Sequence, residues 1–120
     1  MKKFLGVYMG TGAARENAQW NKLTESERKE IETKGIKAWM DWGTANAGAI
    51  VDQGTPLGKT KRASKQGIAD FQNGMTGYVI VQAESHAAAA KLFENHPHFT
   101  IFPGDSVEIM ECLPLPPVRQ

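Results

Sequence analysis

The chain has 120 residues, of which 41% are hydrophobic and 22% are charged. This composition is typical of one globular domain and argues against a disordered chain or a membrane protein. The formal net charge of +1 argues against nucleic-acid binding, because domains that bind nucleic acids usually carry a marked excess of Lys and Arg. We predict a single domain over residues 1–120, with 114–120 as an extended tail that either wraps a neighbouring molecule or frays.

The N-terminal segment and the cysteine content bear on the compartment in which the protein works. The first apolar residues are interrupted by Gly6, Tyr8 and Gly10, and no small-residue cleavage site follows, so a secretory signal is not expected. The one cysteine, Cys112, has no partner for an internal disulfide, which suits a reducing compartment. A cytoplasmic location is the resulting expectation.

Residues 3–9 alternate between two sets of side chains, which predicts a β-strand that ends at Gly10-Thr11-Gly12. A Gly-x-Gly sequence after a strand suggests a dinucleotide-binding loop, but Arg15 stands at the third glycine position and the repeating βαβ pattern is absent. No cofactor is therefore predicted. Residues 17–23 predict a short helical turn.

A long helix is predicted to begin after Thr24. Thr24 and Glu27 have the spacing of a capping box, and the acidic side chains of the first turn suit the positive end of the helix dipole. A glycine commonly ends a helix, so this one should end near Ala47 or Gly48. Trp42 is expected on the flank of its buried stripe. The residues whose helical spacing predicts the stripe are Ile36, Trp39, Met40, Gly43 and Ala47.

The middle of the chain predicts two paired strands. Residues 49–64 are interpreted as one strand, bent by a turn over residues 54–58. Residues 77–83 form the clearest strand of the chain by their β-branched content. The Asn73-Gly74 turn signal, at the end of a loop over residues 66–74, predicts that the two strands pair as an antiparallel hairpin.

The C-terminal third predicts a helix, a loop and a final strand. Ser85 is the expected N-cap of the helix and Pro97 is expected to end it, so residues 96–104 form a loop. In residues 106–113 both alternating sets contain apolar side chains, which predicts a strand inside a sheet that is covered on both faces. The buried stripe of the helix is expected to comprise Ala89, Leu92 and Phe93.

The order strand, helix, strand, strand, helix, strand predicts an α+β, ferredoxin-like βαββαβ fold, with both helices on one face of a four-stranded antiparallel sheet. Two helices cover only one face, yet apolar side chains such as Leu5, Ile80 and Met110 are expected on the other. Exposing several of them would forgo roughly 1.5–3 kcal/mol each and leave a patch that monomers avoid. We predict a homodimer with the sheets face to face, a dimeric α+β barrel.

Four segments stand out by their order along the chain: a first strand ending in Tyr8-Met9, then Ala49-Ile50-Val51-Asp52-x-Gly54-x-Pro56-Leu57-Gly58, then Gly77-Tyr78-x-Ile80-Val81-x-Ala83, and last Pro97-His98 through Gly104-x-Ser106-Val107-Glu108. In this order, which spans nearly the whole chain, they resemble the YCII-related (DGPF) domain proteins, small members of the dimeric α+β barrel group.

The resemblance implies a homodimer with a pocket in each subunit between the helices and the sheet. It also implies relatives that include small-molecule isomerases, monooxygenases and lyases, alongside many proteins without an established activity. Some YCII-like proteins carry a histidine and aspartate pair proposed as catalytic, with the histidine early in the long helix. The corresponding stretch here reads Ile36-Lys37-Ala38-Trp39 and has no histidine.

His98 and Asp52 are the candidate catalytic residues. His98 precedes the last strand and Asp52 ends the second, and a carboxylate can orient and charge an imidazole near neutral pH. The alternative is a loop histidine that caps backbone carbonyls. His96 and His98 could also bind a metal, but Pro97 stiffens their spacing and no third ligand is evident, so no metal site is predicted.

Tyr8, Trp39 and Trp42 are candidate ligand-binding residues, because small-molecule pockets are mostly apolar and aromatic. For Trp39 the alternative is a core position. Lys59, in a basic segment with Lys61, Arg62 and Lys65, either attracts an anionic ligand or belongs to a solvated hairpin edge that its lysines protect. Cys112 is expected to be a buried apolar filler.

Two functions fit these residues. The first is a cofactor-independent small-molecule enzyme of isomerase or lyase type, in which His98, Asp52 and Tyr8 transfer protons. The second is a non-catalytic homodimeric module that binds a metabolite or another protein.

Overall fold

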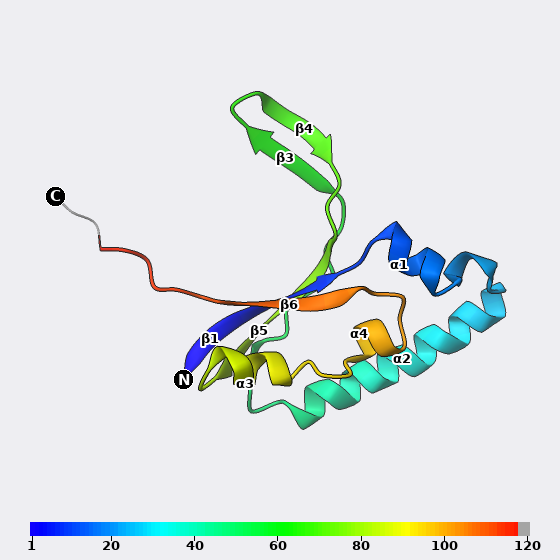
Figure 1. The fold of residues 1–120 in the computed structure, drawn as a ribbon, viewed down its shortest axis with the longest axis horizontal. Helices are drawn as coiled ribbons and strands as arrows, with labels where there is room; N and C mark the ends of the chain where they lie inside the picture. Colours follow the sequence, from blue (N-terminus) through cyan, green and yellow to red (C-terminus); the bar gives the residue numbers. More distant parts are fainter. Residues whose placement is uncertain (118–120) are drawn as a thin grey trace.

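The computed structural model describes residues 1–117, apart from the side chains of Ala13, Ala14 and Asn17. A four-stranded antiparallel sheet forms the centre of the molecule, with the strands in the order β2-β5-β1-β6 and the helices on one side (Figure 1). The predicted α+β class and four-stranded antiparallel sheet are confirmed. The strands of this main sheet are β1 (Lys2–Met9), β2 (Ile50–Asp52), β5 (Met75–Ala83) and β6 (Ser106–Glu111).

The helical segments lie between these strands. The short 3₁₀ turn η1 falls inside the segment predicted as a helical turn. None of the described helices has the length and apolar character needed to cross a lipid bilayer. The segments are α1 (Gly12–Asn17), η1 (Trp20–Lys22), α2 (Glu25–Ala45), α3 (His86–Lys91) and α4 (Pro97–Thr100).

The predicted capping box of α2 is confirmed. The Thr24 hydroxyl accepts a hydrogen bond from the Glu27 N–H at 3.1 Å, and the Glu27 carboxylate accepts one from the Thr24 N–H at 2.9 Å. These two bonds satisfy backbone donors that the first helical turn leaves free. The helix ends at Ala45, slightly before the predicted glycine stop.

The predicted buried stripe of α2 is confirmed for Trp39, which packs against the core. It is wrong for Ile36 and Met40, which are 56% and 68% exposed, and it missed the buried Gly35. Gly35 is buried because the ring of Phe102 occupies the space that a side chain would need. Hydrophobic periodicity identifies large apolar residues. It could therefore not identify Gly35, which is buried by contact with the ring of Phe102, a residue distant in the sequence.

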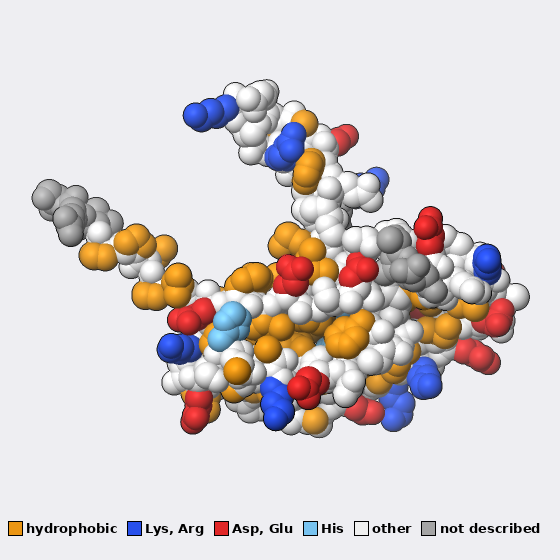
Figure 2. Space-filling view, viewed as in Figure 1, with side chains coloured by type: hydrophobic (Ala, Val, Ile, Leu, Met, Phe, Trp, Pro, Cys, Tyr) orange, Lys and Arg blue, Asp and Glu red, His pale blue; other side chains and the backbone are white. Residues whose placement is uncertain are grey.

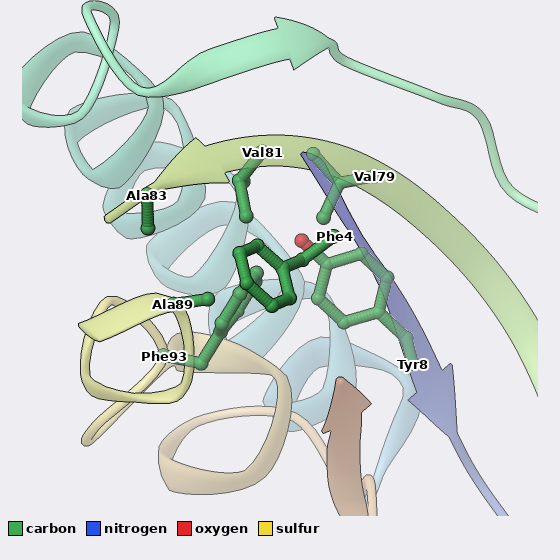
Figure 3. Close-up of a cluster of buried hydrophobic side chains, with 7 residues drawn as sticks. All are labelled: Phe4, Tyr8, Val79, Val81, Ala83, Ala89 and Phe93. Atoms are coloured by element: carbon green, nitrogen blue, oxygen red, sulfur yellow. The ribbon is translucent and has the colours of Figure 1, made fainter. Parts of the chain in front are cut away.

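The helix-facing side of the main sheet carries the core (Figure 3). Ser85 caps α3 as predicted, because its hydroxyl accepts a hydrogen bond from the Ala88 N–H at 3.1 Å. The core positions predicted on this helical segment are confirmed for Ala89, which is 0% exposed, and for Phe93, which is 3% exposed. The buried core residues are Phe4, Tyr8, Val79, Val81, Ala83, Ala89 and Phe93.

The segment predicted as the loop 96–104 contains the short helix α4. Pro97 stands at the first helical position, where its fixed φ suits a helix and its missing N–H does no harm. The His96 Nδ1 accepts a hydrogen bond from the His98 N–H at 3.0 Å and so caps the turn. Pro97 therefore begins a helix, whereas α3 already ends at Lys91, before the predicted stop at Pro97.

A hairpin, called the arm below, projects from the main sheet and consists of β3 (Thr60–Ser64) and β4 (Gly67–Phe71). The two strands pair with each other in a separate sheet (Figure 1). The prediction of one bent strand over 49–64, paired with 77–83, holds as far as Leu57, which still bonds to the β5 segment, and is wrong from Thr60 onward. The tight turn lies at Lys65-Gln66, where Gly67, with φ 103°, allows the chain to reverse.

None of the described helices covers the other side of the main sheet, called the open face below (Figure 1). Strand registers place Leu5 beside Ile80 and Met110, and Val7 beside Tyr78 and Glu108. Apart from Glu108 these side chains are apolar or aromatic, as the alternating pattern of the strands predicted.

Candidate functional site

A cavity of about 660 Å³ lies between the C-terminal half of α2 and the β2–β5 side of the main sheet. This volume falls within the range of small-molecule sites. Three predicted ligand-binding residues, Tyr8, Trp39 and Trp42, line it, so the structure brings them together. Other lining residues that bear on its chemistry are Thr44, Gln53, Thr55, Thr76 and Tyr78.

One wall of the pocket is the turn that leads from β2 toward the arm. Gly54 has φ 66°, and a β-carbon at this position would collide with the carbonyl of Tyr78. The Asp52 carboxylate accepts a hydrogen bond from the Gly54 N–H at 2.8 Å, and the Tyr78 N–H donates to the Thr55 carbonyl at 3.3 Å. A glycine is thus required where this wall closes on β5.

The pocket lining, as the described residues give it, contains no side chain of Asp, Glu, His, Lys or Arg. Its polar groups are hydroxyls and one amide, set among the aromatic rings of Tyr8, Trp39 and Trp42. A charged ligand would lose hydration here without gaining an opposite charge. The lining therefore favours an uncharged, planar organic molecule.

Tyr8 is the lining residue with the most altered acidity. Its side chain is 5% exposed, and burial raises the pKa of its hydroxyl above the ordinary value, while a hydrogen bond from the Trp39 side chain acts weakly in the opposite direction. The phenol therefore keeps its proton at neutral pH. It is suited to donate a hydrogen bond to a ligand oxygen and unsuited to act as a base.

His96 lies in the aromatic cluster behind the pocket and is 0% exposed. Its ring packs edge-on against Trp39 and Trp42, at centroid distances of 4.5 and 4.6 Å, and lies 5.2 Å from the ring of Tyr8. His96 thus contacts all three of the pocket's predicted aromatic residues. Sequence reasoning considered it only as a metal ligand, although it follows Phe93 by three residues and so extends the buried stripe.

The protonation of His96 follows from its contacts. Nδ1 accepts the His98 N–H, so the proton of the neutral ring is assigned to Nε2. Nε2 is buried and has no hydrogen-bond partner within residues 1–117. Burial, and secondarily the neighbouring His98, lowers the pKa of His96 to about 4. The imidazole is therefore neutral at physiological pH.

The two predicted catalytic residues are not brought together. His98 is 7% exposed, and its Nε2 lies 2.7 Å from the carbonyl oxygen of Met9. Asp52 is exposed and binds the Gly54 N–H. No contact between them is found among the described residues, and neither lines the pocket. The alternative role for His98, binding a backbone carbonyl, is the one observed.

Lys59 is exposed and does not line the pocket. Its neighbours on the arm bind within the arm, because Lys61 pairs with Asp70 at 2.7 Å and the guanidinium of Arg62 lies 4.5 Å from the ring centre of Phe71. The solvated hairpin is thus the arrangement observed. Cys112 was expected to be buried but is exposed, since it follows the last residue of β6.

The structure that these residues form was compared with known proteins. No protein-family model matches the chain, and no curated protein sequence matches it, so the YCII-related resemblance stays a prediction. A solved structure of 5-chloro-2-hydroxyhydroquinone dehydrochlorinase (TftG) from Burkholderia phenoliruptrix AC1100, in complex with 2,5-dihydroxybenzoquinone, is similar. The TM-score is 0.51 at 14% identity, over 92% of this chain and 91% of that chain. This likeness establishes a shared fold.

Proposed function

We propose that the protein binds a small, uncharged, planar organic molecule in the pocket between α2 and β5. The Tyr8 hydroxyl donates a hydrogen bond to an oxygen of this molecule and serves as the acid in cofactor-independent proton transfer of isomerase or lyase type. The observation that carries the proposal is a cavity of about 660 Å³ whose described lining is aromatic and uncharged around one protonated phenol.

The chemistry suits a carbonyl compound with an acidic neighbouring C–H. A hydrogen bond from Tyr8 to the carbonyl oxygen would stabilise the negative charge that grows on that oxygen when the neighbouring carbon loses its proton to water. Burial in the aromatic cluster keeps the phenol protonated for this role. The fold shared with a dehydrochlorinase that binds a quinone is consistent with such a ligand.

A non-catalytic metabolite-binding module is the second candidate. The described pocket lining offers an acid but no carboxylate or imidazole that could take up a proton, and His98 and Asp52 have other partners. A site of this kind can bind a ring without transforming it. The two candidates share the ligand class and differ in whether the bound molecule exchanges protons.

The protein is also proposed to work as a homodimer, with the open faces of two sheets packed together. Leu5, Ile80 and Met110 share this face and keep exposed apolar surface, and a second copy is the simplest cover for it. The two copies would form a dimeric α+β barrel with one pocket per subunit. The pocket lies toward α2, so dimerisation leaves it accessible.

The hydrogen bond from Tyr8 predicts a specific loss on mutation. We expect Tyr8→Phe to weaken binding of 2-naphthol about fivefold, because one neutral hydrogen bond contributes about 1 kcal/mol. Isothermal titration of both variants would measure this change. The matched control is 2-methylnaphthalene, which lacks the hydroxyl and whose affinity should not depend on Tyr8. Equal losses for both ligands would show a packing effect and contradict the proposed role.

Proton exchange separates the enzyme from the module. The probe is 2-tetralone, an uncharged ketone with exchangeable protons beside its carbonyl group, followed by NMR in D₂O. The enzyme proposal predicts that the protein accelerates exchange over buffer and that Tyr8→Phe loses most of this acceleration. If 2-tetralone binds but its protons exchange at the same rate as in buffer, the protein is the non-catalytic metabolite-binding module. Failure of 2-tetralone and 2-naphthol to bind would contradict both candidates.

A further inference from the structure

Within residues 1–117, the arm is left largely uncovered by its own chain. Nine of its ten strand residues are exposed, and the apolar side chains of Ile68 and Phe71 are 76% and 44% exposed. A two-stranded hairpin is marginally stable alone in water and normally needs a packing partner. The exposed Ile68 and Phe71 therefore offer apolar surface for contact with another molecule.

The charge of the arm differs in sign from that of the rest of the chain. Residues 59–71, which are the arm and the Lys59 that precedes it, contain four basic residues and one acidic residue, whereas the remainder contains ten Lys and Arg against twelve Asp and Glu. Lys61 is neutralised by Asp70 within the arm. Figure 2 shows Lys and Arg side chains along the arm and acidic side chains on the body below it. The basic residues left over are Lys59, Arg62 and Lys65.

The open face also carries a carboxylate, that of Glu108. Glu108 lies beside Val7 in the sheet, in a row of apolar side chains, and forms no ion pair with any described residue. When two open faces pack together, a carboxylate in this position loses its hydration and requires a cation. On the open face of the same chain, the basic residue of β1 is Lys3. Lys3 stands four positions along β1 from Val7, the residue beside Glu108.

We infer that the arm of one copy lies across the open face of a second copy, with its basic side chains facing Glu108 of the partner subunit. In the proposed arrangement the two-fold axis runs parallel to the strands, between two stacked sheets, which brings the β2 edge of one sheet over the β6 edge of the other. The arm leaves from the β2–β5 side and rises away from the helices (Figure 1). It therefore reaches β6 of the partner. The inference rests on the proposed homodimer.

Deletion of the arm tests the inference. Thr60 and Phe71 are paired at its base, so two glycines can replace residues 60–71 without disturbing the main sheet. We expect the deletion to raise the dimer dissociation constant, measured by sedimentation equilibrium, by at least about tenfold. A wild type that is monomeric at micromolar concentration would overturn the homodimer and the inference together. A dimeric wild type whose dissociation constant the deletion leaves unchanged would overturn the inference alone.

Charge reversal tests the named contact in the intact chain. The variant with Lys59→Glu, Arg62→Glu and Lys65→Glu should weaken the dimer about tenfold, and adding Glu108→Lys should restore part of the loss. A variant with Lys22→Glu, Lys29→Glu and Lys34→Glu, on the helix side, has the same net charge and should change the constant less than about twofold. A failure of Glu108→Lys to restore any of the loss would contradict the assignment of Glu108 as the contact.

Discussion

The free energy of unfolding should fall by about 3 kcal/mol between neutral pH and pH 4 because of His96 alone. The imidazole has an ordinary pKa of 6.5 in the unfolded chain, and burial lowers the pKa to about 4 in the folded protein. Between these values the unfolded chain binds a proton that the folded chain does not. The stabilisation is therefore complete above about pH 6.5 and is lost as the pH falls toward 4.

Urea unfolding of wild type and of His96→Asn at about pH 7 and about pH 4.5 would measure this effect. Asparagine keeps an acceptor for the His98 N–H, because it is a favoured N-cap, and it does not titrate. Between these two pH values, the free energy of unfolding of His96→Asn should fall less than that of wild type, by most of the about 3 kcal/mol attributed to His96. The exposed His86 provides the control, since His86→Asn leaves His96 in place. An identical pH dependence in wild type and His96→Asn would contradict the account of His96.

Gly54→Ala should destabilise the protein by about 2–4 kcal/mol and abolish ligand binding in the pocket. Gly54 has φ 66°, a conformation that costs energy for alanine, and the added β-carbon would collide with the carbonyl of Tyr78. The wall of the pocket would have to move away from β5. Thermal unfolding and titration with 2-naphthol would report the two effects.

Gly58→Ala is the matched control for this substitution. Gly58 lies in the same connection, and a β-carbon there would meet nothing within 4 Å. In the Gly58→Ala variant the free energy of unfolding should change by less than about 1 kcal/mol, and the affinity for 2-naphthol should stay the same. Equal effects of the two substitutions would mean that the connection is sensitive to any lost glycine, and would contradict the specific role of Gly54.

Local signals of the sequence predicted the regular elements well. Thr24 with Glu27 and Ser85 act through hydrogen bonds to residues three positions away, so a short stretch contains all the information that the cap requires. The strand alternation around Val7 and Ile80 also depends on neighbouring residues alone. The main sheet and the starts of α2 and α3 were therefore accessible from the chain itself, whereas α1 and α4 were not predicted.

Long-range contacts explain what the sequence did not show. Gly35 is buried because Phe102 packs on it, and His96 is buried because Trp39 and Trp42 surround it. Each contact joins residues more than fifty positions apart, and no local pattern encodes such pairs. The arm was missed for a related reason. The basic, polar residues 60–64 suit pairing either with β5, as predicted, or with β4, as observed. The turn before Gly67 brings β4 beside them.

The candidate site was predicted in part. Aromatic character pointed to Tyr8, Trp39 and Trp42, which line one pocket because α2 crosses the sheet beside them. Chemical type pointed to His98 and Asp52, but imidazoles and carboxylates also serve as backbone hydrogen-bond partners, as both do here. Residue type therefore identified the apolar lining better than the reacting groups.

A crystal structure of the protein soaked with 2-naphthol tests the central claim most directly. The account predicts the ring in the pocket between α2 and β5, in contact with Trp39 and Trp42, with its hydroxyl within hydrogen-bonding distance of the Tyr8 oxygen. A ring bound elsewhere on the protein, or a pocket that stays empty at saturating 2-naphthol, would contradict it.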